Sequence, residues 1–339
     1  MNQEAKYYNA LNILYKCSYS KLQKYRENFG SWQTTWEGAG REGLDVEAEW
    51  QKLGNRGISL VLRGDGNYPS FLEEAPLPPL GIYVLGILEF SPLSIAIVGT
   101  RAATPRGKEA ARIFAVKLGA AGFTIISGLA MGIDEAAHRG ALDGGGRTVA
   151  VLGTSLDNIY PKQNEGLAKR ILSSGGAIIS EFPLGQEYHP QNFLIRNRII
   201  SGLARATLVI EAPEKSGALA TARFALEQNR EIFVVPGGIE SQNYKGSNGL
   251  IKAGAALVEG PQDILDFFDI KTSEQGAEFK EVGEDEKKIL TALSKNNGEL
   301  APDRLAEITN IDIGCLNKGL AMLTIKGIIK EINGKYSLN

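Results

Sequence analysis

The amino-acid sequence predicts an α/β fold built on a doubly wound, largely parallel sheet. Short apolar runs rich in β-branched residues recur through the middle of the chain, and a glycine or proline follows each run within a few residues. Segments with apolar residues at helical spacing separate these runs, which is typical of parallel strands joined by crossover helices. The expected strands are Ile95–Val98, Phe123–Ile126, Thr148–Leu152, Ala177–Ser180, Thr207–Glu211 and Ile232–Val235. Because strand and helix alternate as far as Phe268, we expect a Rossmann-like sheet with helices on both faces.

Length and composition indicate a globular protein of two or three domains. The chain has 339 residues, of which 43% are hydrophobic and 22% charged, so it can bury a sizeable core. Cys17 and Cys315 lie near opposite ends, which favours a reducing compartment and no disulfide framework. No uninterrupted apolar run reaches the length of a membrane span, so we expect a cytoplasmic protein with no membrane partner.

The sequence divides into five expected segments. Residues 1–60 form a small helical domain that resembles a degenerate SAM or helix-hairpin-helix unit without the glycine hairpin, so a structural or partner-binding role is favoured. Residues 61–93 are rich in proline and are expected to form an extended connector. The Rossmann-like domain spans 94–270, and a polar, flexible linker follows at 271–283. The last domain covers 284–339.

The last domain is expected to be a winged helix. Three amphipathic segments precede two short β-prone runs around Asn333-Gly334, which is the strongest short hairpin pattern. The third amphipathic segment has few arginines, which is poor for reading a major groove. A protein-binding or autoregulatory role therefore fits this domain as well as DNA binding does.

Turns that contain glycine follow the expected strands, and several of them carry a basic or hydroxyl residue. The candidate binding residues in these turns are Gly99, Thr100, Arg101, Ser127, Gly128, Lys162, Lys215, Ser216 and Gly217. Because the carboxyl ends of parallel strands meet at one edge of a sheet, the turns predict one basic, glycine-lined pocket. The N–H groups that open the following helices carry partial positive charge and suit phosphate. The alternative is that glycine serves turn geometry alone.

Charge is distributed unevenly along the chain. Residues 95–260 carry 18 Lys and Arg against 14 Asp and Glu, a balance of +4, which leaves 19 against 25, or −6, elsewhere. The excess is modest, but Arg101 lies in one of these turns, and Arg196 and Arg198 lie between the fourth and fifth expected strands, which favours a polyanionic ligand for the middle domain.

A helix is expected between the fourth and fifth strands, and its residues suit a single-stranded nucleic acid. In a helix, Phe193, Arg196 and Asn197 share one face and Arg198 lies on another. A ring on which a base can stack, beside cations for the backbone, is what an unpaired strand requires. The alternative is a helix whose Phe193 belongs to the core and whose arginines pair with carboxylates such as Glu181.

Catalytic and cofactor chemistry find little support in the sequence. Asp134 and His138 are spaced i, i+4 as a metal pair could be, but no third ligand stands nearby, so a capping aspartate with a hydrogen-bonded histidine is favoured. Lys215-Ser216-Gly217 is not preceded by the glycines of a P-loop, and the turn at Gly99 does not give the dinucleotide-binding pattern. We therefore expect no catalytic residue, no metal and no cofactor.

Six motifs in a fixed order carry a family resemblance. They are Val98-Gly99-Thr100-Arg101, Ser127-Gly128-Leu129-Ala130-Met131-Gly132-Ile133-Asp134, Tyr160-Pro161-Lys162, Arg196-Asn197-Arg198-Ile199-Ile200-Ser201, Lys215-Ser216-Gly217 and Pro236-Gly237. Together they resemble the DNA-processing protein DprA (Smf) family. The resemblance implies a non-catalytic, single-stranded DNA-binding homodimer that protects incoming strands and loads the RecA recombinase during natural transformation. It also implies that backbone phosphates contact Arg101 and Lys162, that a base lies near Phe193, and that the pocket is completed by Arg196, Arg198 and Lys215.

The alternative is an enzyme, a nucleotide-processing phosphoribohydrolase of the lysine-decarboxylase-like type. Its related Rossmann fold also has a Pro-Gly-Gly turn, which continues with Gly-Thr and a catalytic glutamate. Here the turn at Pro236 runs instead into Ile239-Glu240-Ser241. The enzyme interpretation therefore lacks its glutamate, and binding is the favoured activity.

Overall fold

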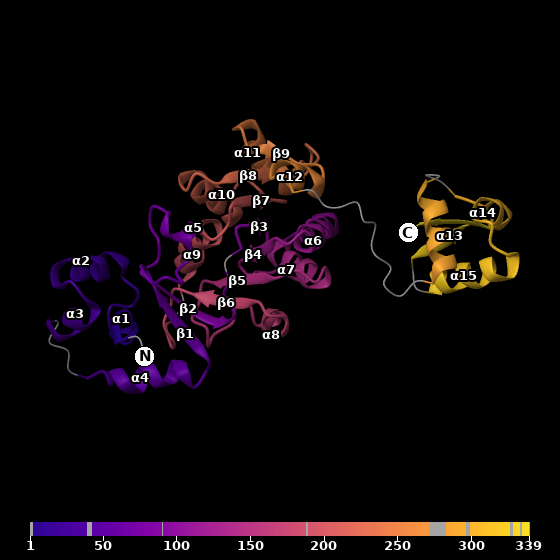
Figure 1. The fold of residues 1–339 in the computed structure, drawn as a ribbon. Coiled ribbons are helices and arrows are strands. Elements are labelled where there is room, and N and C mark those ends of the chain that lie inside the picture. The colour runs from indigo at the N-terminus through magenta and orange to yellow at the C-terminus, as the bar shows by residue number, and fades with distance from the viewer. Residues whose placement is uncertain are drawn as a thin grey trace. The chain divides into compact units, whose positions relative to one another are not determined.

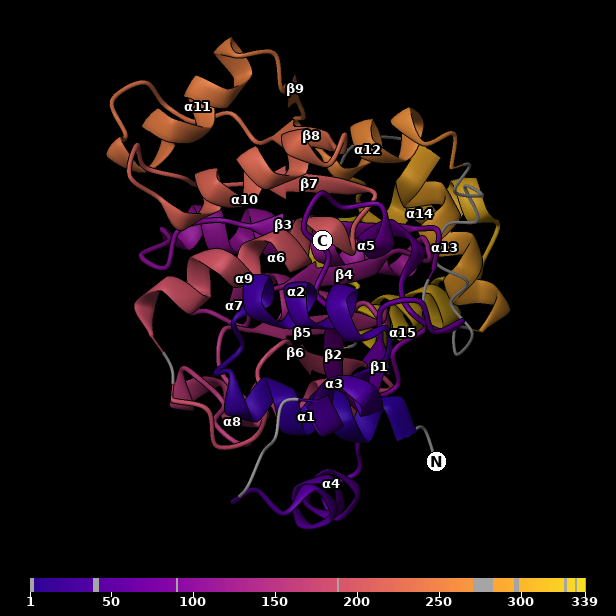
Figure 2. The ribbon, with the colours of Figure 1, turned by 90° about the vertical axis from the view of Figure 1, so that its left-hand side faces the viewer.

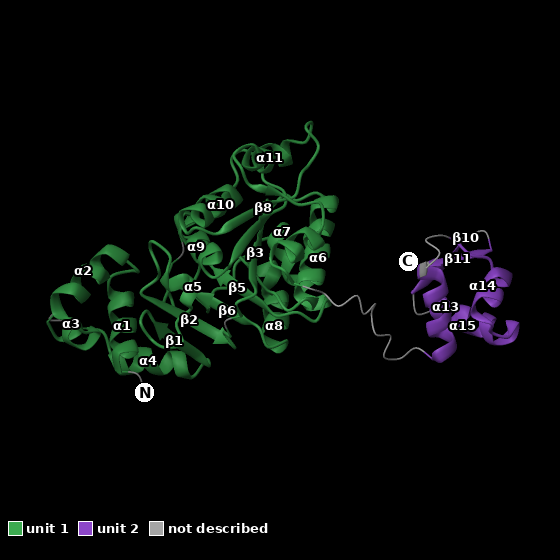
Figure 3. Ribbon diagram, turned by 45° about the horizontal axis from the view of Figure 1, so that its top comes forward, with its two compact units in different colours: residues 1–271 green, residues 272–339 purple. Residues whose placement is uncertain are grey.

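The chain forms two compact units, residues 1–271 and 272–339 (Figure 3). The computed structural model describes residues 3–38, 43–89, 91–187, 189–270, 283–295, 299–325, 328–332 and 334–338. All of the predicted linker except Gly283 lies outside these described residues.

A nine-stranded sheet forms the centre of the first unit (Figure 1). Its strands are β1 (Ile58–Leu62), β2 (Gly81–Gly86), β3 (Ser94–Val98), β4 (Thr124–Ser127), β5 (Thr148–Leu152), β6 (Ala177–Ser180), β7 (Ala206–Val209), β8 (Glu231–Val234) and β9 (Ala256–Leu257). Their order across the sheet is β1-β2-β6-β5-β4-β3-β7-β8-β9. Every neighbouring pair from β6 across to β9 is parallel, whereas β1 and β2 add an antiparallel edge. The predicted α/β fold with a largely parallel sheet is confirmed.

Helices cover both faces of the sheet because alternate strand residues are buried on opposite sides (Figures 1 and 2). In β3, Ala96 and Val98 belong to a core shared with α5 (Ser70–Glu73), α9 (Pro190–Gly202) and α10 (Gly217–Glu227). On the other side, Ile95 and Ile97 pack with α6 (Pro105–Ala120), α7 (Ile133–Asp143) and α12 (Pro261–Phe267). The remaining elements of this unit are η1 (Lys162–Asn164), α8 (Glu165–Ser173), η2 (Gln242–Tyr244) and α11 (Lys245–Lys252).

The N-terminal helices share their core with the sheet. They are α1 (Gln3–Leu14), α2 (Tyr19–Phe29), α3 (Trp32–Gly38) and α4 (Val46–Gly54), as expected for a small helical module. Tyr8 and Leu11 of α1 lie in one apolar cluster with Leu60 of β1, Tyr83 of β2 and Ile171 of α8. The module is therefore packed onto the sheet, and its core is continuous with the sheet's.

The segment expected to be an extended connector differs from that expectation, because it supplies part of the sheet. β1 continues to Leu62, and β2 pairs with β6 so that Tyr83 lies opposite Ser180. Side chains of β2 are buried on both faces: Ile82 packs toward α9, and Tyr83 packs toward α1. The prolines that suggested a connector lie before β2, between 76 and 79, where they leave strand pairing undisturbed.

The second unit contains three helices followed by a hairpin. The elements are α13 (Glu284–Lys295), α14 (Pro302–Thr309), α15 (Ile313–Ile325), β10 (Ile329–Ile332) and β11 (Lys335–Leu338). Their apolar side chains form a separate core that includes Ile289, Leu305 and Leu320. This order of elements is the one expected, and the winged-helix assignment itself stays a prediction; Asn333 of the expected turn lies outside the described residues. Across the described parts of both units, every helix is too short or too polar to span a bilayer.

Candidate nucleic-acid interface

A cavity opens at the carboxyl ends of β3 and β7, where the winding of the sheet reverses. The two strands are neighbours, but the helices that follow them, α6 and α10, pack on opposite faces. Such a switch point leaves a crevice in which α/β proteins bind ligands. The cavity has a volume of about 400 Å³. The predicted residues that line it are Gly99, Thr100, Arg101, Phe193, Arg196, Asn197, Lys215, Ser216 and Gly217.

A second cavity of about 220 Å³ adjoins the first and is more apolar. The two share Arg101, Phe193 and Arg196. The second is completed by Gly128, Met131, Tyr160 and Pro161 among others. Met131 and Tyr160 are 48% and 38% exposed, so this slot is open to a flat apolar group. Neither Met131 nor Tyr160 was predicted as a site residue, although each stands within one of the motifs that carry the family resemblance.

Arg101 and Lys215 are the exposed cations that line the larger cavity. The guanidinium carbon of Arg101 lies 5.4 Å from the centroid of the Phe193 ring. The ring of Tyr160 lies 5.4 Å from that of Phe193, tilted by 47°. An arginine over an aromatic ring keeps its charge and presents it beside an apolar surface. Cationic and aromatic groups thus stand side by side at this rim.

Arg196 lies in the interior of the site, where it is only 4% exposed. It donates to the carbonyl oxygens of Gly128, at 2.9 Å, and of Val151. Burial lowers the pKa of its guanidinium to about 10, and the charge of Asp134 opposes this shift, so the group stays charged at neutral pH. A Cβ on Gly128 would lie 2.7 Å from Arg196 Nη2 and 2.7 Å from Asp134 Oδ2, so a larger residue here would displace these two buried groups. Arg196 therefore fixes the floor of both cavities and gives it positive charge.

Asn197 and Ser216 hold the start of α10 at the edge of the larger cavity. Asn197 Nδ2 donates to the carbonyl oxygen of Gly217 at 3.1 Å. Ser216 Oγ accepts from Ala218 N at 3.2 Å and so caps the helix. These contacts place Lys215, the residue before the cap, at the mouth of the cavity.

Three predicted site residues do not line either cavity. Ser127 is fully buried, and its hydroxyl donates to the carbonyl oxygen of Ile97 at 2.7 Å. Lys162 is exposed at the start of η1, beyond the Tyr160-Pro161 segment that does line the smaller cavity. Arg198 is 7% exposed and forms an ion pair with Glu181.

Arg198 is the clearest correction among them, because the geometry matches the alternative interpretation, in which an arginine of this helix pairs with Glu181. Arg196 and Arg198 are two residues apart on α9, so their side chains leave the helix about 200° apart. One of them faces the cavities and the other faces away.

The N-terminus of α6 is another correction, because it is occupied by a carboxylate of the protein. Glu211 is fully buried, and one of its oxygens accepts from Thr104 N at 2.9 Å while the other accepts from Thr104 Oγ1. A Cβ on Gly107 would lie 2.4 Å from the Glu211 carboxyl carbon, so glycine in the first turn lets the acid approach. The positive end of this helix is thus neutralised internally and is not offered to a phosphate.

Asp134 and His138 are also engaged within the protein. Asp134 Oδ2 accepts from Gly128 N at 3.1 Å; burial raises the pKa of this carboxyl, and Arg196 opposes the shift. His138 Nδ1 lies 2.7 Å from Thr148 Oγ1, which donates to the carbonyl oxygen of Ile125, so Nδ1 carries the proton. The described residues bring no three His, Cys, Asp or Glu side chains together in a metal-binding group.

His138 should make the stability of the first unit depend on pH. Burial, followed by the charge of Arg196, lowers the pKa of His138 from 6.5 to about 3. Between those values the unfolded chain binds the extra proton, so the stabilisation is complete above about pH 6.5 and is lost as the pH falls toward 3. We expect this residue to cost about 2 kcal/mol of unfolding free energy on going from pH 7 to pH 5. Urea unfolding of His138→Gln should show a correspondingly weaker pH dependence.

The exposed His189 provides the control. His189→Gln should retain the full pH dependence of the unmodified chain. Equal pH dependence in His138→Gln and the unmodified chain would show that His138 is not held neutral.

Comparison with known proteins identifies the family. The family model for DNA recombination-mediator protein A matches residues 59–269, which is more than half of the chain. Protein Smf of Synechocystis sp. is 38% identical over 310 residues, covering 80% of this chain and 77% of the relative.

Two solved structures resemble the chain as well. The X-ray structure of DNA processing protein A (DprA) from Streptococcus pneumoniae has a TM-score of 0.61 and 34% identity, covering 71% of this chain and 82% of that one. A structure describing the single-stranded DNA binding mode of DNA processing protein A from Helicobacter pylori has a TM-score of 0.57 and 30% identity, covering 63% and 97%. The expectation of a binding protein rather than an enzyme agrees with the family description. The chain belongs to the DNA recombination-mediator protein A family, also called DprA or Smf.

Proposed function

We propose that the two adjoining cavities bind single-stranded DNA. The observation that carries this proposal is the shared rim, where Arg101 stands over Phe193, Lys215 lines one cavity, and Tyr160 and Met131 line the other. The exposed cations suit backbone phosphates, and the apolar slot suits the face of a base. The base must be unpaired to enter the slot, which favours a single strand over a duplex.

The Helicobacter pylori neighbour supports this proposal, because its structure was described for single-stranded DNA binding and it shares 30% identity with this chain. The roles of the predicted residues divide accordingly. Arg101 and Lys215 would contact phosphates, Phe193 would stack on a base, and Arg196 and Asn197 would hold the floor. Lys162 is exposed beyond the smaller cavity and would contact a strand that extends past it.

The geometry does not support the phosphoribohydrolase alternative. The turn at Pro236–Gly238 lines neither cavity. Gly237 exchanges two hydrogen bonds with the Asn248 side chain, at 3.2 and 2.9 Å, which makes it a structural turn. Glu240, the acid nearest to it in sequence, is exposed.

Titrating the full chain with labelled single-stranded and duplex oligonucleotides at several salt concentrations tests the proposal. We expect tighter binding to the single strand, and an affinity that falls steeply with salt because counterions are released from the phosphates. Equal affinity for duplex, or release of base from nucleoside monophosphates, would contradict it.

Phe193→Ala should weaken single-strand affinity by about 1–3 kcal/mol, because a stacked base loses its ring. The slope of log affinity against log salt should stay unchanged, since no cation is removed. Phe224→Ala, which removes a ring on α10 that lines neither cavity, is the matched control and should bind normally. An unchanged affinity in Phe193→Ala would show that the ring takes no part in binding.

We further propose that the protein acts in the cytoplasm as a homodimer that delivers single strands to the RecA recombinase.

An exposed edge strand supports the dimer: β9 ends the sheet, and Leu257 on it is 48% exposed. An edge strand presents unpaired N–H and C=O groups to another chain, and because β9 is only two residues long, the exposed Leu257 side chain must supply much of the contact. Leu257→Lys should weaken self-association by roughly tenfold or more, measured by sedimentation equilibrium, and a stable dimer in that variant would place the interface elsewhere. Faster assembly of RecA on a single strand in the presence of this protein would test delivery.

A further inference from the structure

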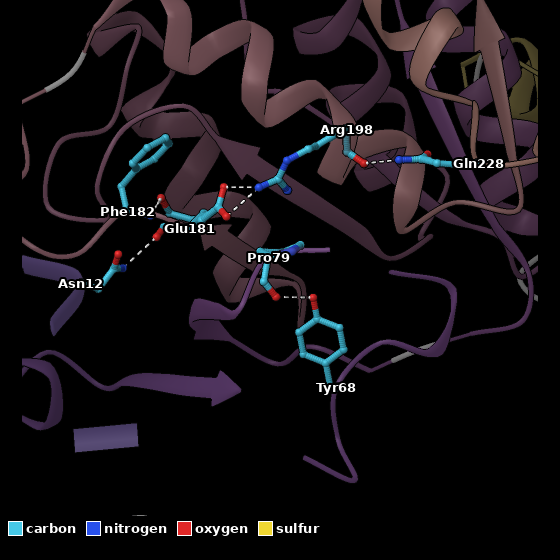
Figure 4. Close-up of polar contacts among 8 residues, drawn as sticks. Asn12, Tyr68, Pro79, Glu181, Phe182, Arg198 and Gln228 are labelled. Atoms are coloured by element: carbon cyan, nitrogen blue, oxygen red, sulfur yellow. Dashed lines mark hydrogen bonds and ion pairs between the residues drawn. The ribbon is translucent and has the colours of Figure 1, made fainter. Parts of the chain in front are cut away.

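A buried ion pair joins the back of α9 to the end of β6 (Figure 4). Arg198 Nη2 lies 2.6 Å from Glu181 Oε1 and 2.7 Å from Oε2, so one nitrogen is shared between both carboxylate oxygens. The exposed fractions of the two side chains are 9% and 11%. A charged hydrogen bond of this kind is short and directional, and it fixes the orientation of the groups that make it.

Helix α1 of the N-terminal module holds the acid side of this pair. Asn12 Nδ2 donates to the backbone carbonyl oxygen of Glu181 at 3.2 Å, as Figure 4 shows, and also lies 3.2 Å from Tyr83 Oη. Tyr83 Oη in turn donates to Asn9 Oδ1 at 2.9 Å. These polar groups are buried, so their hydrogen bonds act without competition from water.

The arginine side of the pair lies on the helix that carries the proposed DNA contacts. Arg198 lies on α9 two residues after Arg196 and directly after Asn197. Its backbone carbonyl oxygen accepts a hydrogen bond from Gln228 Nε2 at 2.8 Å (Figure 4). Because Arg196 and Arg198 point to opposite sides of α9, a force that turns Arg198 also turns the face that lines the cavities. Contacts on the side of α9 opposite the cavities therefore constrain the rotation of this helix.

The energetics indicate a geometric role for this pair. A buried ion pair contributes little net stability, since desolvation of both charges offsets their attraction, and apolar pairs of similar volume are often as stable. An apolar pair, however, is not directional. The ion pair can therefore fix the rotation of α9 about its own axis, which apolar packing does not.

We propose that Glu181 and Arg198 are positioning residues, and that through Asn12 and this pair the N-terminal module sets the orientation of α9 at the DNA site. This proposal rests on the proposed function. It gives the N-terminal helices a contribution to DNA affinity without a DNA contact of their own.

The test measures single-strand affinity of full-length variants by fluorescence anisotropy over a range of salt. Glu181→Gln should weaken binding roughly tenfold, within the range by which residues away from a ligand change its affinity. The slope of log affinity against log salt should stay at the value of the unmodified chain, whereas Arg101→Ala should reduce it by about 0.7. A reduced slope in Glu181→Gln would mean that loss of a phosphate contact explains the effect, and would overturn the proposal.

A double variant separates positioning from stability. Glu181→Leu combined with Arg198→Met removes both charges, so thermal stability should return close to that of the unmodified chain, while affinity should stay about as weak as in Glu181→Gln. If the double variant recovers full affinity together with stability, the pair is merely structural and the proposal fails. This variant also keeps the test decisive if Glu181→Gln does not fold.

Asn12 and Asn9 offer a matched pair on α1. Asn12→Ala should lower affinity several-fold, in the range expected for coupled residues, whereas Asn9→Ala should not, because Asn9 contacts Tyr83 and not Glu181. Equal affinities of these two variants would remove the N-terminal module from the proposal. A chain that binds single strands but is unaffected by Glu181→Gln overturns this inference alone, whereas an unmodified chain that does not bind overturns the proposed function and this inference with it.

Discussion

Arg101→Glu is expected to reduce single-stranded DNA affinity by about 100-fold or more at 0.1 M salt, an effect of roughly 3 kcal/mol. The substitution changes the charge at the shared rim by two units, where Arg101 is exposed and lines both cavities. Near a protein surface, charges a few ångströms apart interact by a few kcal/mol, so loss of one attraction and gain of one repulsion account for the size. The cation above the Phe193 ring is lost as well.

Fold and binding can be separated for this variant, because Arg101 makes no ion pair among the described residues and its removal leaves no buried partner. We expect an unchanged circular dichroism spectrum and thermal midpoint. Arg170→Glu, a charge reversal on α8 at a residue that lines neither cavity, is the matched control and should bind nearly normally. Tight binding by folded Arg101→Glu would place the DNA site elsewhere on the molecule.

The central sheet could be predicted because parallel strands buried on both faces appear as short, continuous apolar runs. Ile95–Val98 is such a run, and each of its residues is buried in the structure. β1 and β2 were not predicted, because β1 pairs with β2, and the pairing of β2 with β6 depends on contacts about 100 residues away along the chain. Prolines close to β2 also resembled those of a connector, and sequence alone does not say which side of a proline a strand occupies.

Part of the candidate site could be predicted from the sequence. The residues that could be predicted differ from those that could not for a physical reason. The rule that the carboxyl ends of parallel strands meet at one edge correctly brings together the turns at Arg101 and Lys215. Helical periodicity separates Arg196 from Arg198, but it does not say which face turns to solvent and which meets a buried acid such as Glu181. That choice is made by tertiary packing.

Two further features could not be recognised before the fold was known. Glu211 ended an expected strand and carried no motif, yet its carboxylate caps a helix that begins 106 residues earlier in the chain, at Pro105. Tyr160 and Met131 line one cavity with Phe193 only because the turns after β4 and β5 converge with α9. The spacing of residues along the chain predicts none of these long-range contacts.

Glu211→Gln is expected to destabilise the first unit by about 2–4 kcal/mol and to weaken single-strand binding. The carboxylate is fully buried and accepts from both the backbone N–H and the hydroxyl of Thr104 at the start of α6. A glutamine keeps the shape but loses the charge that stabilises the positive end of the helix, and its amide NH₂ then faces donors. Binding should weaken because the turn that carries Arg101 lies between β3 and this cap, and Thr100 N also donates to the Glu211 carbonyl oxygen at 2.7 Å.

The stability change is measured by the urea midpoint, and Glu109→Gln on the exposed face of the same helix is the control. Glu109 pairs with Arg112 at the surface, where ion pairs contribute little, so its midpoint should not move. Restoring a short acid with Glu211→Asp should not recover the loss, since the carboxylate would no longer reach Thr104. If Glu211→Gln unfolds at the same urea concentration as Glu109→Gln, the buried carboxylate does not hold the helix, and the Arg101 turn must be fixed by its other contacts.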